Sequence, residues 1–336
     1  MIFLMVFTFF IFFIANFLIF INLDKISKFV NLYDIPDKKL KTHKNKTSLV
    51  GGSILIFNIF LLLIIDLILK VQLFDFFLSF KEKFIFLFML FSYFLLGFYD
   101  DKFNMNPNKK FFLLIFITTI FVILDENLVI QKFSLSFYDY KIFLEKYSIF
   151  FSIFCFVTLI NALNFYDGIN GQSLIFYLIV FLYLFFVTER IQLYGIILII
   201  LTFLLFLNLR NRLFLGDNGI YVLTLFLSTS LIYEHNVYRN ILFADEIFML
   251  LLLPGLDLLR LTIFRLLKGK NPFYGDRNHI HHLLIKRYSL LNTNLILLIL
   301  GVIPIVFFKI LKLNFFLIIP IFVIIYCLTI FKIKKT

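Results

Sequence analysis

Charged residues are scarce in this sequence, and so are the cysteines that stabilise small secreted folds. Asp, Glu, Lys and Arg make up 15% of the 336 residues, whereas apolar side chains make up 62%. Soluble proteins have about 25% charged and about 45–50% apolar residues. The composition therefore excludes an ordinary soluble fold and predicts an integral membrane protein. Cys155 and Cys327 both lie in apolar stretches, so we expect two small core residues rather than a disulfide or a metal pair.

Tryptophan is absent, whereas phenylalanine occurs 52 times and lysine outnumbers arginine. This bias is typical of an AT-rich genome. Single Phe and Lys residues are therefore weak evidence for function.

The long apolar runs predict an all-α polytopic fold with ten or eleven transmembrane helices. Crossing a bilayer takes about 20 apolar residues. The runs span residues 2–23, 48–69, 84–98, 111–124, 148–160, 173–188, 191–207, 219–233, 246–265, 291–311 and 313–331. The third, fourth and fifth are short, so we expect these helices to extend into the adjoining loops. Little chain is left for a soluble domain, so we expect residues 1–336 to form one membrane domain, with an uncleaved first span.

The distribution of Lys and Arg predicts the orientation of the chain. The loops after the odd-numbered spans, with the C-terminus, hold 21 of the 32 basic residues, the other loops hold 10, and Arg260 lies in a span. Lys and Arg resist translocation. We therefore expect the N-terminus outside and the C-terminus in the cytoplasm. The net charge of +12 follows mostly from this asymmetry, so anionic headgroups or substrates are expected partners and nucleic acid is not.

Polar motifs rich in acids, amides, glycines and histidines gather in the loops on that same side. Gly97–Asp101 reads GFYDD, Asn161–Gln172 reads NALNFYDGINGQ, Phe214–Gly219 reads FLGDNG, and Asp276–His282 reads DRNHIHH. A protein that only packs in lipid has no need for such one-sided clustering. The pattern favours an active site at the membrane surface.

Two of these motifs favour magnesium or phosphate chemistry. Asp100 and Asp101 are adjacent acids, which also occur at solvated helix ends, but Mg²⁺ prefers carboxylate oxygens together with substrate phosphates. In the second motif Asn161, Asn164 and Asp167 recur every three residues and share one face of a continuing helix. Gly168 and Gly171 then permit a tight turn or the close approach of a ligand.

The remaining motifs are individually less specific. Asp217 lies between two glycines at the start of a span, where an acid is well placed to hold a cation against the membrane face, although a simple turn is an equal alternative. His279, His281 and His282 follow Asp276 and Arg277, as expected of donors to phosphate oxygens. Metal binding by the histidines is a lesser alternative.

Three further stretches have plainer interpretations. Asp257 and Arg260 lie three residues apart in a span and are expected to neutralise each other, although charges in spans often mark function. The alternating residues 131–143 predict a short hairpin on the opposite side. The lysine-rich loop DIPDKKLKTH (34–43) fits the orientation rule alone, but it leads into Gly51 and Gly52.

In this order, the motifs resemble the polyprenyl-phosphate N-acetylhexosamine-1-phosphate transferases. That superfamily also contains the phospho-N-acetylmuramoyl-pentapeptide transferases. The resemblance runs from Asp34 to about Leu284, and it includes PGLDLLRLTIFRLLKGKNPF and HIHHLL near its end. It implies transfer of a sugar-1-phosphate from a UDP-sugar to a polyprenyl phosphate with release of UMP. It also implies a Mg²⁺ cofactor (Mn²⁺ as a substitute) and an active site on the cytoplasmic face of a bacterial inner membrane.

The resemblance also implies roles for individual residues. Asp217 would bind the metal with Asn164 and Asp100, and Asp100 and Asp101 would handle the polyprenyl phosphate or metal. The nucleotide pocket would be lined by Asn161, Asn164, Asp167 and Asn170. The diphosphate would be bound by Arg277, His279, His281 and His282, with Lys41 and His43 assisting and His281 taking part in catalysis.

Two positions depart from the family pattern, and three alternatives stay open. Asn170 replaces an acid that the family usually has, and Ile220 replaces a small hydroxyl residue. The HIHH form resembles the branch that starts O-antigen, enterobacterial-type or teichoic polymers. The pentapeptide branch, with three consecutive histidines, is an alternative. A lipid-linked sugar flippase is another, and a homodimer is left open.

Overall fold

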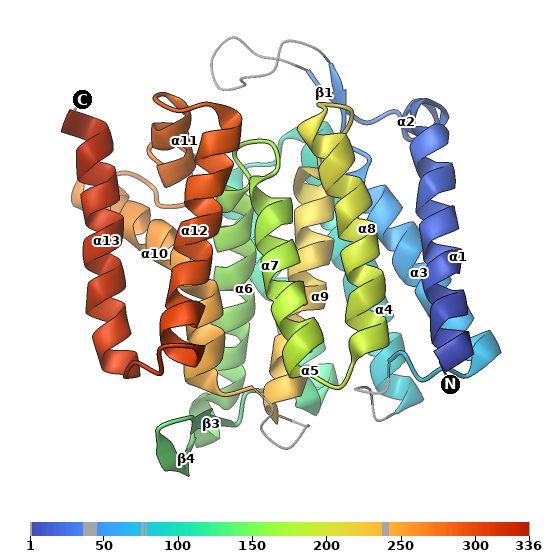
Figure 1. Ribbon diagram of the computed structural model, residues 1–336, viewed down its shortest axis with the longest axis horizontal. Coiled ribbons are helices and arrows are strands. Elements are labelled where there is room, and N and C mark those ends of the chain that lie inside the picture. The colour runs from blue at the N-terminus through green and yellow to red at the C-terminus, as the bar shows by residue number, and fades with distance from the viewer. Residues whose placement is uncertain (1, 36–45, 75–76, 78, 237–241, 336) are drawn as a thin grey trace.

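The computed structural model describes residues 2–35, 46–74, 77, 79–236 and 242–335, and it is a bundle of long helices (Figure 1). The first half of the chain forms α1 (Ile2–Ile21), α2 (Leu23–Val30), β1 (Tyr33–Asp34), β2 (Thr47–Ser48), α3 (Gly51–Leu69), α4 (Phe80–Phe103), α5 (Pro107–Leu124), η1 (Glu126–Leu128), β3 (Lys132–Leu135), β4 (Tyr138–Phe143), η2 (Glu145–Tyr147) and α6 (Ser148–Tyr166). The second half forms α7 (Gln172–Val187), α8 (Ile191–Leu209), α9 (Gly216–Asn236), α10 (Ala244–Leu267), α11 (Ile280–Ile285), α12 (Leu290–Lys309) and α13 (Phe315–Lys335).

The predicted all-α membrane fold is confirmed. The long helices α1, α3 to α10, α12 and α13 match the predicted spans one to one. Within the described residues, nine of them are long and apolar enough to cross a membrane, and α7 is a shorter apolar helix. The three short runs do extend into the adjoining polar motifs, so Asp100 and Asp101 lie in the last turn of α4, and Asn161 and Asn164 lie in α6.

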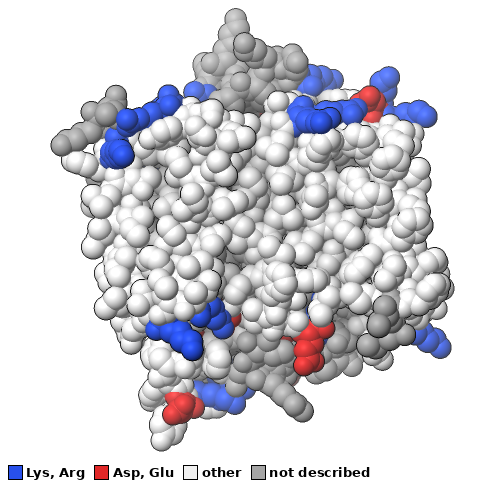
Figure 2. Space-filling view, in the orientation of Figure 1, with Lys and Arg blue, Asp and Glu red and all other residues white. Residues whose placement is uncertain are grey.

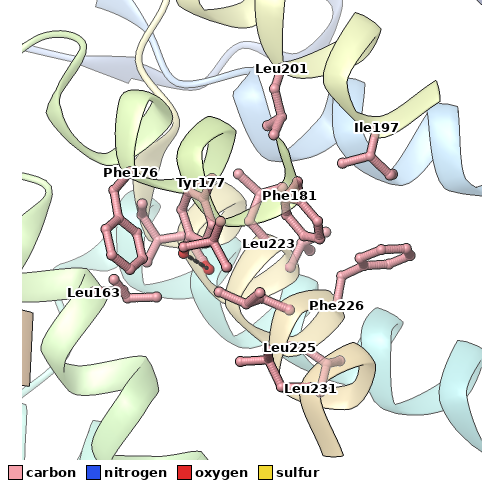
Figure 3. Close-up of a cluster of buried hydrophobic side chains, with 14 of the residues drawn as sticks. Leu163, Phe176, Tyr177, Phe181, Ile197, Leu201, Leu223, Leu225, Phe226 and Leu231 are labelled. Atoms are coloured by element: carbon pink, nitrogen blue, oxygen red, sulfur yellow. Dashed lines mark hydrogen bonds between the residues drawn. The ribbon is translucent and has the colours of Figure 1, made fainter. Parts of the chain in front are cut away.

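The helix α9 differs from the other spans because it is enclosed by protein. Its side chains from Asn218 to His235 are all buried. It packs against α3, α4 and α6, and Figure 1 shows it in the middle of the bundle. Polar side chains on a helix that is buried on all sides are stabilised where they find hydrogen-bond partners. Thr224 accordingly bonds the Tyr177 hydroxyl at 2.6 Å. Figure 3 shows this tyrosine among apolar side chains of α6, α7, α8 and α9.

Polar capping residues determine where α4 and α5 begin. The Ser79 hydroxyl accepts the Glu82 amide at 3.2 Å, which caps α4, and it donates to the Glu82 carboxylate at 2.9 Å. Asn104 ends α4 in the left-handed conformation (φ 50°). Asn106 then caps α5, with a proline at the first helical position. This tight turn brings the first residues of α5 back over the last turn of α4.

The two ends of the bundle are polar and its side is apolar. Figure 1 places the C-terminus, α11 and β1 at one end (the α11 end) and the N-terminus, β3 and β4 at the other (the hairpin end). On the face in Figure 2, Lys, Arg, Asp and Glu lie towards the two ends, with a white band between them. Such a band matches the hydrocarbon layer of a bilayer. All four polar motifs lie at the α11 end, so the one-sided clustering predicted from the sequence is confirmed.

Two smaller expectations have different outcomes. The hairpin is confirmed, because β3 and β4 pair antiparallel, with Lys132 opposite Phe143. The expectation that both cysteines are core residues is wrong. Cys327 is exposed and Cys155 is only partly buried, and neither forms a disulfide. They lie on the outer helices α13 and α6, where the surface itself is apolar.

Glycines let the backbone of α9 approach α3 and α4 closely. A methyl group at Gly97 would lie 2.5 Å from the backbone of Asn218, and one at Gly52 would lie 2.6 Å from it. Real side-chain atoms do not approach backbone this closely, so either substitution would push α9 away. The Gly51-Gly52 pair therefore has a packing function that its sequence did not reveal.

The substitution Gly97→Ala should destabilise the protein by about 1–3 kcal/mol, because the added methyl overpacks the α4–α9 contact. The matched control is Gly255→Ala on α10, where an added Cβ meets nothing within 4 Å. The control should be neutral or slightly stabilising, since alanine favours helix. Thermal unfolding in detergent measures both variants. Equal melting temperatures for the two would contradict the close-approach argument.

Candidate active site

The Asp101 carboxylate fastens the start of α9 to the end of α4. One of its oxygens accepts the Asp217 amide at 2.9 Å, and the other accepts the Asn218 amide at 3.0 Å and the Asn218 side chain at 2.5 Å. The first N–H groups of a helix have no partner inside the helix and carry partial positive charge. Asp101 satisfies them from a neighbouring helix. With both oxygens engaged in this way, its contacts are those of a positioning residue.

Asp100 points elsewhere, although it is the next residue along α4. One oxygen accepts the Met105 amide at 2.7 Å, which closes the turn into α5. The other lies 2.6 Å from the ammonium of Lys110. Consecutive helical residues point about 100° apart. The two adjacent acids therefore have different partners: Asp100 contacts α5, and Asp101 contacts the start of α9.

Lys110 lies at the centre of a cluster of oxygens from three helices. Besides Asp100 on α4, its ammonium bonds the carboxylate of Asp217 on α9. The amide of Asn164 on α6, with its oxygen and nitrogen placed to satisfy both neighbours, accepts from Lys110 at 3.1 Å and donates to Asp217 at 2.9 Å. The Lys110 side chain is 16% exposed, and the Tyr221 ring lies 5.4 Å away. The predicted site residues Asp100, Asn164 and Asp217 thus lie together around one cation.

Asp167 lies beside this cluster, where the chain leaves α6. It accepts a hydrogen bond from Ser173 in the first turn of α7. Burial raises the pKa of Asp167 to about 6, and the negative charge of Asp217 adds to the shift, while the Ser173 bond opposes it. Asp167 therefore lies near Asp217, and it ionises near pH 6.

Asn170 points away from this cluster. Its side chain donates to Asn211 at 2.5 Å, and its carbonyl accepts from Asn294 at 2.8 Å. Gly171 follows with φ 86° and donates to Asn208 at 2.6 Å. The contacts of Asn170 tie the loop to α12 and to the α8–α9 connection, and they do not include the neighbouring acids.

The imidazole of His281 faces the same loop from α11. It is fully buried, and its Nδ1 lies 3.1 Å from the side-chain nitrogen of Gln172. Among the residues that the structure describes, its Nε2 has no hydrogen-bond partner, and it lies against Gly168, where a Cβ would come within 1.8 Å of it. Because the Gln172 nitrogen donates, Nδ1 accepts and the ring proton belongs on Nε2. The lack of a side chain at Gly168 thus lets the His281 ring pack directly against the α6–α7 loop.

His281 and His282 are neutral at physiological pH. Burial lowers the pKa of His281 well below its usual value, and the neighbouring His282 and His279 add to the shift. Burial, with the nearby charges of His279 and Arg277, lowers the pKa of His282 to about 4. Each ring can therefore offer one N–H donor to an anion, but no positive charge.

His279 has both ring nitrogens in contact with buried side chains. Nδ1 lies 2.7 Å from Asp257, and Nε2 lies 3.3 Å from Arg265. Asp257 also binds Arg260 at 2.8 Å, as predicted, and the Tyr326 hydroxyl at 2.5 Å. These contacts fasten α11 to α10 and α13 and so position His281.

The remaining predicted residues have different surroundings. Asn161 donates back to Val157 on its own helix at 2.7 Å. Arg277 is partly buried on the loop before α11. Asp276 bonds Arg265 at 2.9 Å; burial opposes ionisation, but the arginine outweighs it and lowers the pKa of Asp276. Lys41 and His43 lie outside the described residues.

Two residues at the site were missed by sequence reasoning. In the sequence Lys110 is one of many lysines that follow the orientation rule, and Gln172 is only the last residue of a motif. The signal for Lys110 was its position in the first turn of α5, after the capping Asn106-Pro107 pair that ends the return from Asp100. No comparable signal identified Gln172.

The donor set around Lys110 suits Mg²⁺. In the part of the chain that the structure describes, no three His, Cys, Asp or Glu side chains form a metal-binding group. Mg²⁺ commonly binds one or two carboxylates and completes its shell with water and substrate phosphates. Asp100, Asp217 and the Asn164 amide provide such a partial set of hard oxygen ligands.

Comparison with known proteins confirms the resemblance that the motifs predict. Residues 83–235 match the family described as Glycosyl transferase family 4. This range includes Asp100, Asp101, Lys110, Asn164, Asp167 and Asp217, but not the histidines of α11.

The curated relatives are enzymes named undecaprenyl-phosphate alpha-N-acetylglucosaminyl 1-phosphate transferase. The one from Escherichia coli K12 is 24% identical over 203 residues, which is 57% of this chain and 55% of the relative. The one from Salmonella typhi is 26% identical over 207 residues, or 56% and 54% of the two chains. The match thus spans about half the length of these relatives.

Asp167→Asn should stabilise the protein at pH 8 and have little effect near pH 4. The folded-state pKa of about 6 lies above the ordinary value of 3.8, so ionising this acid costs stability as the pH rises through that window. Removing the charge should add about 1–3 kcal/mol at pH 8. Thermal unfolding at the two pH values measures the difference.

Asp276→Asn is the matched control and should have the opposite sign. Its pKa is lowered by Arg265, so its charge stabilises the fold at neutral pH and this contribution fades in acid. If both variants shifted the melting temperature at pH 8 in the same direction, the assignment of the two environments would be wrong.

Proposed function

We propose that this protein transfers a sugar-1-phosphate, of the N-acetylhexosamine class, from a UDP-sugar to a polyprenyl phosphate and releases UMP. The observation that carries the proposal is the cluster of Asp100, Lys110, Asn164 and Asp217, buried at one end of a membrane bundle. Such a cluster would hold a cation that balances the negative charge of phosphate groups at a membrane surface. The relatives, named for the undecaprenyl-phosphate reaction, support the same chemistry.

The proposed orientation places this end in the cytoplasm of a bacterial cell, with the N-terminus outside. Nucleotide sugars are cytoplasmic, and the basic residues are concentrated in the loops of the same end. The product would be the first lipid-linked intermediate of a cell-envelope polysaccharide, such as O-antigen.

A groove between α5 and α10 is the proposed site for the lipid acceptor. It has a volume of about 680 Å³ and is lined mostly by apolar residues, among them Phe111, Phe112, Leu266, Pro272 and Phe273. Phe112 and Leu266 are 72% and 59% exposed on the outer surface of the bundle. Phe111 directly follows Lys110 in α5. A polyprenyl chain in this groove would therefore bring its phosphate towards the acidic cluster.

The donor would bind on the other side of the cluster, where the α6–α7 loop meets α11. Asp167 and Gly168 lie there, and the His281 Nε2, which has no hydrogen-bond partner among the described residues, lies against Gly168. A neutral donor suits a diphosphate oxygen. We assign His281 to the diphosphate and Asp167 to the nucleotide portion of the donor.

In the proposed reaction, an oxygen of the acceptor phosphate attacks the β-phosphorus of the UDP-sugar. A bond forms between them as the bond from the β-phosphorus to the bridging oxygen breaks, and UMP leaves with that oxygen. A phosphate monoester is already largely a dianion at neutral pH. Asp100 therefore need not act as a base, and trapping a phosphorylated aspartate would contradict direct attack.

Positioning and charge neutralisation provide most of the rate enhancement in phosphoryl transfer. Asp217, Asp100 and Asn164 would hold Mg²⁺, which supplies positive charge to the diphosphate oxygens when bound. Asp101 keeps Asp217 in place by anchoring the start of α9. His281 would orient the donor, and the surrounding helices would limit access of water.

Purified protein supplied with undecaprenyl phosphate, Mg²⁺ and a panel of UDP-sugars should release UMP with at least one N-acetylhexosamine donor. Asp217→Asn should lower the rate by about 10³-fold or more while the protein stays folded, because a group that balances the transition-state charge is lost. The matched control is Asp24→Asn, an exposed acid at the same end that pairs with Arg212. It should leave the rate unchanged. Absence of UMP release with every donor would sink the proposal.

A further inference from the structure

We propose that the ammonium of Lys110 occupies the cation site of the resting protein, and that a metal ion binds there only when Lys110 moves out. Metal binding would then depend on the arrival of an anionic substrate that takes up the displaced ammonium. This inference rests on the proposed function for the identity of the anion, a nucleoside diphosphate. The exchange itself rests only on the geometry of the site.

The ammonium and a metal ion would contact the same atoms. Lys110 lies 2.6 Å from one oxygen of Asp100, bonds one oxygen of Asp217 and donates to the Asn164 amide at 3.1 Å. These oxygens come from α4, α9 and α6, and together they form the partial ligand set suited to Mg²⁺. The cation that fills this set is supplied by a fourth helix, α5.

In the described part of the site, the carboxylate oxygens that do not contact the ammonium already accept hydrogen bonds. The other oxygen of Asp100 accepts the Met105 amide, and the other oxygen of Asp217 accepts the Asn164 amide. Both oxygens of Asp101 are engaged at the start of α9. Mg²⁺ binds oxygen at about 2.1 Å, so a metal on these carboxylates would nearly coincide with the ammonium. The two cations therefore exclude each other.

The ammonium cannot leave its site without a new anionic partner. The site is buried, and a buried charge without a counterion is costly. Lysine has a flexible four-carbon chain, so its ammonium can move several ångströms while α5 stays in place. A diphosphate bound beside Asp217 would offer the negative charge that the ammonium loses. Metal and anion should therefore bind cooperatively, each raising the affinity for the other by the same factor.

The test measures Mn²⁺ binding by electron paramagnetic resonance on the full-length protein in detergent, without lipid acceptor and without turnover. Wild-type protein should bind Mn²⁺ weakly alone and on the order of tenfold or more tightly with UDP present. Lys110→Met should bind Mn²⁺ alone on the order of tenfold more tightly than wild type, and UDP should then have a smaller effect.

Lys109→Met is the matched control, because it removes the same charge from the adjacent, exposed residue. It should leave both Mn²⁺ affinities unchanged. If Lys110→Met bound Mn²⁺ no more tightly than wild type, or if Lys109→Met had the same effect as Lys110→Met, the exchange would be refuted.

Loss of Lys110 leaves two carboxylates facing each other, so the metal-free variant is expected to be less stable. Mn²⁺ should raise its melting temperature more than that of wild type, because ligand binding stabilises the folded state. If Lys110→Met does not fold, Lys110→Gln and the UDP dependence of wild type test the same claim. Equal Mn²⁺ affinity of wild type with and without UDP would contradict it.

The proposed function and the exchange at Lys110 can be refuted independently of each other. Absence of UMP release with every donor would remove the transferase proposal, but it would not change the Mn²⁺ comparison between Lys110→Met and Lys109→Met. Conversely, unchanged Mn²⁺ affinity in Lys110→Met would refute the exchange even if the enzyme released UMP.

Discussion

The hydrogen bonds from Asp101 to the start of α9 are the constraint on which the site depends. The first N–H groups of a helix have no hydrogen-bond partner within the helix. Asp101 satisfies two of them. Glycines on α3 and α4 allow the close approach that these bonds require. Together these contacts place Asp217 beside Asp100, which fixes two acids from distant parts of the sequence at one point.

Two like charges at that point require a cation. The tight turn between α4 and α5 supplies Lys110, and α6 adds the Asn164 amide. The same charge balance explains why the site suits phosphate transfer, since the reaction replaces one set of charges by another. The histidines near the start of α11 are held by a different set of contacts. His279 is held by Asp257 and Arg265, and the uncharged ring of His281 packs against Gly168.

The fold and the location of the site are easier to predict from the sequence than the contacts that each residue of the site makes. Apolar runs and loop charges are enough to place the helices and to bring the polar motifs to one end. They do not separate Asp100 from Asp101, because the directions of neighbouring helical residues depend on which helices pack nearby. In the sequence Lys110 resembles the other lysines of the loops, and its role depends on contacts with distant residues. The sequence pattern also does not predict the contacts of Asn170, whose side chain bonds Asn211 and whose carbonyl bonds Asn294.

The most direct test of the central claim is the structure of the protein with Mn²⁺ and UDP, using anomalous scattering to locate the metal. The account predicts a single strong peak about 2.1–2.3 Å from oxygens of Asp217 and Asp100, the range for such ions. It also predicts that the Lys110 ammonium has moved off both carboxylates towards the diphosphate. A peak elsewhere, or a metal bound with Lys110 still between the two acids, would contradict the account.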